Sequence, residues 1–132
     1  MADQAAAGRR FNWCVADAET DLGLGNLTMF GIHRGGVGDA ELGYWLHPGA
    51  QGRGVMSEAI EGVARWYFGA EEGNGFGGRR LFIRTAESNT AARRTAEKAG
   101  FQLAGIEREA FRLSTHLDGK VTYDLLSTDF AG

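Results

Sequence analysis

The sequence predicts an α+β fold, in which helices pack on a mostly antiparallel mixed sheet, within one domain spanning residues 1–132. Two observations predict this class. Short segments of strand-like length, either alternating in polarity or apolar throughout, are interrupted by two longer segments whose apolar residues recur at helical spacing. Twenty-one glycines stand against one proline. This is more than twice the usual glycine share of about 7% and is typical of turns in a compact sheet protein.

Three strands are expected first. Residues 11–16 (FNWCVA) have strand character, residues 24–33 (LGNLTMFGIH) supply a hairpin partner, and residues 40–46 (AELGYWL) form the third strand. Because glycine-rich turns separate them, an antiparallel meander is the simplest arrangement. Side chains alternate along a strand, so Glu41 is expected on the face opposite Leu42.

Two helices follow the meander. The first ends at Gly69 and is predicted by apolar residues on one helical face, namely Met56, Ile60, Val63, Ala64 and Tyr67. The second begins near Thr90 with Ser88 or Asn89 as its cap and ends at Gly100. One face of this second helix carries only small side chains, those of Ala92, Ala96 and Ala99. It can therefore pack closely.

The remaining segments are read as strands. The apolar run at residues 81–83 is too short for a helix and suits a central strand between the two helices. Residues 101–113 and 120–127 alternate well enough for two further strands. The dipeptide Asp118-Gly119 between them predicts a tight hairpin turn.

Composition excludes several classes of protein. A net charge of −3 argues against broad attraction to nucleic acid or to an anionic membrane. Cys14 is the only cysteine, so no intrachain disulfide is expected. His33, His47 and His116 show no metal-ligand spacing, and no apolar run has the length of a membrane span. We expect a cytoplasmic protein without a metal, whose partner binds at a specific site.

The glycine stretch at residues 49–54 (GAQGRG) lies between the third strand and the first helix. The first turn of a helix has backbone N–H groups without intrahelical partners, and the helix dipole favours an anion there. Gly52 and Gly54 leave this backbone uncovered, and Arg53 adds a cationic donor. The alternative is a tight connection with no ligand, and spacing alone does not decide between the two.

Longer motifs around this stretch resemble a known family. Residues 40–60 (AELGYWLHPGAQGRGVMSEAI) are similar to the central segment of the GNAT superfamily of acyl-CoA-dependent N-acetyltransferases. The signature of that family is Gln/Arg-x-x-Gly-x-Gly/Ala, and Gln51 and Gly54 match its first two positions. Residues 88–105 resemble the Asn-initiated helix and Glu-Lys-x-Gly-Phe ending of the Rim-type branch, the ribosomal-protein N-terminal acetyltransferases. The resemblance covers about residues 11–130.

The resemblance implies transfer of an acetyl group from acetyl-CoA to a primary amine, either a protein N-terminus or a small molecule. The pantetheine arm of acetyl-CoA would lie in a splay between residues 40–46 and 79–85, with the diphosphate on the amides of residues 51–56. Met56 departs from the family's Gly or Ala and is expected to crowd these amides. Asn89 is either a helix cap or a cofactor contact, or both. The implied cofactor-binding residues are Leu46, Gln51, Gly52, Arg53, Gly54, Val55, Met56, Ser57, Asn89 and Arg94.

Two glutamates are candidates for the catalytic base. Glu41 matches the general base of part of the superfamily, and enclosure among aromatic residues would raise its pKa toward useful basicity. The alternative is a solvated or ion-paired strand residue, with Arg34 as a possible partner. Glu109 is the second candidate, because Rim-type relatives often carry an acid on the strand after the second helix. Glu107 stands beside it as an alternative.

No side chain is identified as the catalytic acid. Ala96 and Ala92 occupy positions where relatives carry tyrosine and serine, and neither alanine can donate a proton. A backbone amide at Leu46 or His47 is the expected oxyanion donor. His47 itself is expected to be a turn residue before the proline.

The region before the first strand is shorter than in the family, with ten residues in place of a strand and two helices. The expected fold therefore lacks these elements, and the uncovered sheet edge and face predict a homodimer. Two other functions stay open. The chain could be a degenerate module that binds acetyl-CoA without transferring the acetyl group, or a structural or interaction domain.

Overall fold

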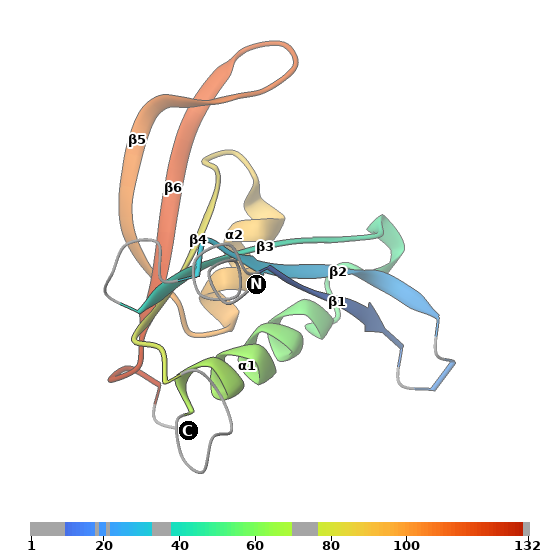
Figure 1. The fold of residues 1–132 in the computed structure, drawn as a ribbon. Helices are drawn as coiled ribbons and strands as arrows, with labels where there is room; N and C mark the ends of the chain where they lie inside the picture. The colour runs from blue at the N-terminus through green and yellow to red at the C-terminus, as the bar shows by residue number, and fades with distance from the viewer. Residues whose placement is uncertain (1–9, 18, 21, 33–37, 70–76, 131–132) are drawn as a thin grey trace.

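A computed structural model describes residues 10–17, 19–20, 22–32, 38–69 and 77–130. The described chain forms one six-stranded sheet with the strand order β1-β2-β3-β4-β6-β5 (Figure 1). The strands are β1 (Phe11–Ala16), β2 (Gly23–Phe30), β3 (Asp39–Leu46), β4 (Arg80–Ala86), β5 (Gln102–Arg112) and β6 (Leu117–Leu126). The helices are the short 3-10 helix η2 (Pro48–Ala50), α1 (Val55–Phe68) and α2 (Thr90–Lys98).

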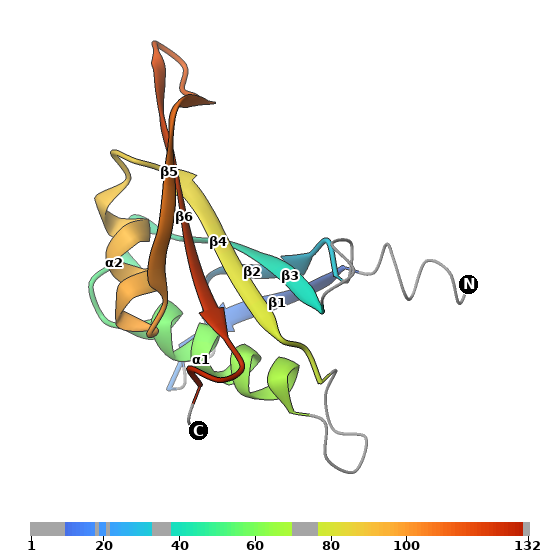
Figure 2. The same cartoon turned by 90° about the vertical axis from the view of Figure 1, so that its left-hand side faces the viewer.

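The sheet is mixed but mostly antiparallel, as the sequence predicts. Strand β3 pairs with β4 in parallel, and every other neighbouring pair in the sheet is antiparallel. The parallel pair is joined through α1, which crosses over one face of the sheet. Helix α2 packs on the same face (Figure 2). Within the described residues, the opposite face carries no helix.

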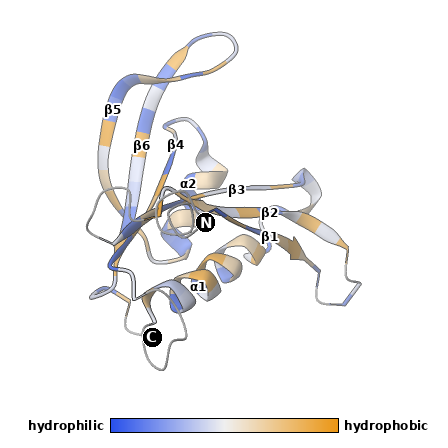
Figure 3. Ribbon diagram, viewed as in Figure 1, coloured by the Kyte–Doolittle hydropathy of each residue, from blue (hydrophilic) through white to orange (hydrophobic). Residues whose placement is uncertain are grey.

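The hydrophobic core lies between this face and the two helices. Strand residues alternate, so every second side chain points toward the helices and is buried. Figure 3 shows hydrophobic positions along α1 and in the strands of the sheet. The largest fully buried side chains are Tyr67, Tyr123, Leu27, Met29, Ile32, Leu42, Met56, Ile60, Leu81, Ile83 and Val121. The helical period predicted for α1 is therefore confirmed, with Met56, Ile60, Val63, Ala64 and Tyr67 all buried.

The two parallel strands separate part way along their length. Their pairing runs from Asp39 with Arg80 to Leu42 with Ile83 and then stops. Strand β3 continues to Leu46, whereas β4 follows β6 as far as Ala86. The two ribbons diverge beyond this point (Figures 1 and 2). This is the splay that the family resemblance implies.

The predicted hairpin turn at Asp118-Gly119 is wrong. Both residues belong to β6, where Asp118 pairs with Phe111, and the turn is closed instead by a bond from Leu113 N to His116 O (2.9 Å). The Asp118 carboxylate accepts hydrogen bonds from Ser88 N (3.0 Å) and Ser88 Oγ (2.6 Å). Contacts with the loop before α2 therefore override the local turn preference of the dipeptide.

None of the described helices is long and apolar enough to cross a membrane.

Candidate functional site

A cavity of about 620 Å³ lies on the helix side of the splay. Its walls come from the end of β3, the glycine turn, the first turn of α1 and one face of α2. The lining residues are Tyr44, Trp45, Leu46, Gln51, Gly52, Gly54, Val55, Met56, Ser57, Asn89, Ala91, Ala92, Arg94, Thr95 and Lys98. Segments that are about 40 residues apart in the sequence thus meet around one space.

The start of α1 offers this cavity a set of backbone donors. Gly54 precedes the helix in the left-handed conformation (φ 74°), and the helix has no side-chain cap. The first backbone hydrogen bond into the helix is donated by Glu58 to the carbonyl of Gly54 (3.1 Å). The amides of residues 52–57 donate no hydrogen bond to any described residue. These amides, at the positive end of the helix dipole, can bind an anion.

The charged side chains that line the cavity are both cationic. Arg94 and Lys98 lie four residues apart on α2 and so share one face of the helix. The Lys98 Nζ atom lies 2.8 Å from the position that a Cβ atom on Gly54 would take, which places the ammonium group beside the first turn of α1. Neither cation forms an ion pair with any described residue. In a protein with a net charge of −3, this is a local concentration of positive charge, which favours a negatively charged ligand.

Of the ten residues proposed for the cofactor, the structure brings nine to this cavity, and Arg53 lies elsewhere. The Arg53 guanidinium is 3.9 Å from the carboxylate of Asp17, in the turn between β1 and β2. Its charge therefore belongs to a half-exposed ion pair rather than to the lining of the cavity.

Three of the nine also hold the protein together. Ser57 Oγ donates to the carbonyl of Thr95 (3.0 Å), which ties α1 to α2. Asn89 Oδ1 accepts from Ala92 N (3.1 Å), so Asn89 caps α2 and lines the cavity as well. The side chain of Met56 is 1% exposed and belongs to the hydrophobic core. Met56 thus belongs both to the core and to the lining of the cavity, and its effect on the amides stays a prediction.

Glu41 lies on the open face of the sheet, at the closed end of the splay. Its carboxylate accepts two hydrogen bonds from Arg84, at 2.8 Å from Nη2 and 3.3 Å from Nε. These bonds are the main reason why the pKa of Arg84 is raised, and the charges of Glu41 and Glu107 add to the effect. Glu41 is thus ion-paired, but with Arg84. The alternative partner Arg34 lies outside the described residues.

The second candidate base lies away from this pair. Glu109 sits in an irregular, exposed part of β5 and has a positive φ of 48°. Glu107 is the acid of that strand whose charge reaches Arg84. Of the two alternatives, Glu107 is therefore the one that interacts with the arginine bound to Glu41.

Sequence reasoning missed several lining residues, of which Lys98 and Tyr44 have the most chemical interest. Lys98 could have been found from its spacing, because it follows Arg94 by one helical turn. Tyr44 shares a strand face with Leu46, which was predicted to line the site. The approach of α2 to the first turn of α1 cannot be predicted from any local sequence pattern.

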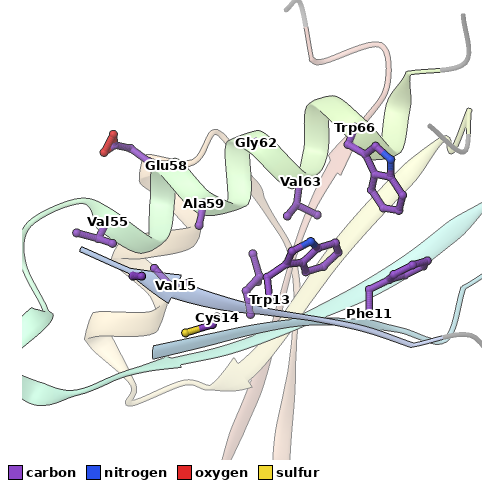
Figure 4. Close-up of a pocket in the computed structure, with 12 residues that line it drawn as sticks. Phe11, Trp13, Cys14, Val15, Val55, Glu58, Ala59, Gly62, Val63 and Trp66 are labelled. Atoms are coloured by element: carbon purple, nitrogen blue, oxygen red, sulfur yellow. The ribbon is translucent and has the colours of Figure 1, made fainter. Parts of the chain in front are cut away.

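A second cavity, of about 790 Å³, lies between β1 and α1 (Figure 4). Aromatic rings dominate it: Phe11 and Trp13 from β1 both stand edge-on to Trp66 of α1, with centroids 5.2 Å and 5.9 Å away. Its one charged lining residue is Glu58, which points away from these rings (Figure 4). This cavity is larger, but it lacks the cationic side chains that favour an anionic ligand. Among the described residues, no cluster of side chains suited to a metal ion is found.

Comparison with known proteins gives a consistent result. Residues 1–102 match the acetyltransferase (GNAT) domain family. A probable N-acetyltransferase of Bacillus subtilis, YjcK, is 28% identical over 104 residues, which are 79% of this chain and 55% of that protein. A ribosomal-protein-serine acetyltransferase of Escherichia coli is 33% identical over 79 residues, or 60% of this chain and 41% of that protein. The chain spans about half the length of these curated relatives.

Solved structures share the fold. A spermidine N-acetyltransferase of Vibrio cholerae, SpeG, superposes with a TM-score of 0.80 at 17% identity, over 99% of this chain and 73% of that one. The acetyltransferase MccE, solved with acetyl-CoA and AMP, has a TM-score of 0.66 at 26% identity, over 80% of this chain and 55% of that one. The resemblance to Rim-type enzymes is confirmed by the Escherichia coli relative. The family match covers well over half of the sequence, and the chain belongs to the GNAT family of acetyltransferase domains.

Proposed function

We propose that this domain transfers the acetyl group of acetyl-CoA to a primary amine. The observation that carries the proposal is the cationic cavity: uncapped amides of α1, Arg94 and Lys98 converge where the parallel strands separate. The amides of residues 52–57 and Lys98 would hold the diphosphate. The pantetheine arm would follow β3 from Leu46 toward Leu42, about 13 Å of strand. Acetyl-CoA supplies the activated acyl group, and the remaining steps fall to side chains of this chain.

Glu41 is the residue that we propose as general base. An amine that approaches the splay from the open face of the sheet reaches it beside the carboxylate of Glu41. The two hydrogen bonds from Arg84 fix the orientation of that carboxylate. A carboxylate held in this orientation can accept a proton from the attacking amine. Glu109 lies in the exposed bulge and is the weaker candidate, since Glu107 and not Glu109 affects the pKa of Arg84.

Two kinds of acceptor agree with the comparisons. The Escherichia coli relative is named for a ribosomal-protein serine, which supports a protein N-terminus. A structural neighbour acts on spermidine by its name, which supports a small-molecule amine. Both acceptors are primary amines, so the chemistry at the thioester is the same.

Two experiments, carried out one after the other, test the function. Calorimetric titration with acetyl-CoA is expected to show binding, and its absence would leave only a structural or interaction role. Release of the CoA thiol is then followed with a panel of polyamines, amino sugars and N-terminal peptides. Binding of acetyl-CoA without thiol release for any amine would favour the degenerate module. The alanines at positions 92 and 96, which cannot donate a proton, are the reason for considering this alternative.

The base is tested by a Glu41→Gln variant, which keeps the shape of the side chain. We expect turnover to fall most near neutral pH and less at high pH, where the free amine is more abundant. An unchanged pH profile would reject Glu41 as the base. Arg84→Met is the companion variant, because it leaves Glu41 in place but removes its partner.

We further propose that the domain is a cytoplasmic homodimer that binds neither nucleic acid nor membranes. The hairpin of β5 and β6 extends from the body of the protein (Figure 1), and Leu103, Ile106 and Leu117 on it are exposed to between 44% and 48%. Exposed apolar side chains on an edge hairpin favour self-association. Sedimentation at micromolar concentration is expected to show a dimer, and a monomeric profile would reject this part of the proposal.

A further inference from the structure

Tyr44 brings a phenol group into the splay. It lies on β3 two residues beyond Leu42, where pairing with β4 stops, and it lines the cationic cavity. Its hydroxyl donates a hydrogen bond to the carbonyl oxygen of Ala92 on α2 (2.8 Å). The phenol therefore spans from the strand to the helix on the cavity side of the sheet.

The carbonyl of Ala92 does not depend on this hydrogen bond. Ala92 lies inside α2, where the amide of the residue four positions later is its regular partner. The Tyr44 hydroxyl can thus turn toward a ligand atom without leaving a buried carbonyl unpaired. Burial raises the pKa of Tyr44, and the nearby Tyr123 adds to the shift. The phenol consequently keeps its proton at neutral pH and remains a donor.

Other hydroxyls in the cavity are placed differently. Ser57 is on the first turn of α1, at the phosphate end, and donates to Thr95 O. Thr95 donates to Ala91 O one turn back on α2 (3.0 Å). Tyr44 is the hydroxyl residue of the lining that stands on β3, near the closed end of the splay. The diphosphate would be held at the opposite end, so the thioester would lie toward Tyr44.

On the basis of the proposed function, we propose that the Tyr44 hydroxyl donates a hydrogen bond to the sulfur atom of CoA as the thioester is cleaved. The amine nitrogen forms a bond to the acetyl carbon, the C–S bond breaks, and its electron pair stays on sulfur. The amine proton passes to Glu41 and then to solvent. Tyr44 keeps its own proton and stabilises the thiolate, which water protonates on release. Tyr44, on a strand, thereby supplies the donor to sulfur that neither Ala92 nor Ala96 can supply.

The test measures the pKa of the CoA thiol when it is bound. Free CoA is titrated into wild-type protein and into Tyr44→Phe from pH 6 to pH 10, and the thiolate is followed by its ultraviolet absorbance. A donor to the thiolate lowers the pKa of the bound thiol. A hydrogen bond to a charged atom is strong enough to change an affinity about tenfold. From low to high pH, the affinity for CoA is therefore expected to rise about tenfold more in wild type than in Tyr44→Phe. Desulfo-CoA, which has no sulfur atom, is expected to bind both proteins equally at every pH.

Tyr67→Phe is the matched control. The Tyr67 hydroxyl also donates to a backbone carbonyl, that of Gly38, at the same 2.8 Å, and burial raises its pKa to about 12, but Tyr67 does not line this cavity. It should cost a similar thermal shift and leave the bound thiol unchanged. Arg94 and Lys98 line the same cavity but are unchanged in these variants, so they do not contribute to the difference between them.

Each outcome has a clear meaning. Equal pKa values for the bound thiol in wild type and Tyr44→Phe would overturn the role of Tyr44 and leave the proposed function intact. A wild-type protein that binds no CoA would overturn the proposed function and this inference with it. A higher thiol pKa in Tyr44→Phe alone supports the assignment.

Discussion

Replacing Lys98 with alanine tests the placement of the diphosphate. The Lys98 ammonium lies beside Gly54, at the end of α1 where the free amides are, and no described acid neutralises it. A unit charge about 4 Å from a phosphate oxygen contributes about 1 kcal/mol in bulk water and about 4 kcal/mol near a protein surface. Lys98 is exposed, so we expect a value near the lower end, about 1.5 kcal/mol. This corresponds to roughly tenfold weaker binding.

The assay is calorimetric titration with three ligands, namely acetyl-CoA, 3′-dephospho-CoA and pantetheine. Lys98→Ala is expected to weaken the first two by similar factors and to leave pantetheine unchanged, because only pantetheine lacks the diphosphate. The loss should shrink as salt is added, since the charge is exposed. Lys120→Ala is the control: Lys120 is the only other lysine and lies on β6, outside the cavity lining.

Three results would refute this placement of the diphosphate. Wild-type affinity of Lys98→Ala for acetyl-CoA would show that the ammonium group does not reach a phosphate. An equal loss for pantetheine would show that the substitution disturbs the cavity rather than a charge contact. A loss for acetyl-CoA alone would instead place Lys98 at the 3′-phosphate.

Three further predictions concern the elements that hold the site. Gly54→Ala should lower the free energy of unfolding by about 1 kcal/mol because of the positive φ, and it should weaken acetyl-CoA binding by displacing Lys98. The control is Gly62→Ala in α1, where a Cβ atom meets open space, and it should be neutral or stabilising in the same thermal melts. Met56→Ala should cost about 2–5 kcal/mol in denaturant unfolding, because the side chain is 1% exposed and belongs to the core; a cost below about 1 kcal/mol would contradict that placement. The Ser88 hydroxyl, followed by its amide, lowers the pKa of Asp118 below the ordinary 3.8. This stabilisation exists above pH 3.8 and is lost as the pH falls through the native pKa, so the melting temperatures of wild type and Ser88→Ala should converge in acid.

The sequence was sufficient for the elements whose residues are set by a local period. Helix α1 follows its apolar face from Met56 to Tyr67, and β3 follows the alternation that separates Glu41 from Leu42. The glycine turn was recognisable because glycines just before a helix leave the free amides of its first turn uncovered. Such features depend on neighbours within a few residues.

The sequence was insufficient where partners are distant along the chain. Asp118-Gly119 has the composition of a hairpin turn, yet contacts with Ser88 and Glu87 keep it in β6. A Cβ atom on Gly119 would overlap the Glu87 carboxylate, so this glycine serves a close approach between strands and loop. The pairing of Glu41 with Arg84 likewise needs the register of β3 against β4, which no local pattern contains.

The two halves of the proposed chemistry lie on opposite faces of the sheet, and the splay connects them. The groups proposed to bind the phosphates are on the helix face, where α1 and α2 begin or pass, whereas the carboxylate of Glu41 is on the open face. A fully paired sheet would keep these groups apart, because its backbone hydrogen bonds leave no passage between strands. Pairing of β3 with β4 ends at Leu42 and Ile83, so the thioester end of a bound arm can meet an amine from the other side. The bond between Arg84 and Glu41 joins the strands at this boundary, and loss of either partner should therefore affect acetyl transfer more than acetyl-CoA binding.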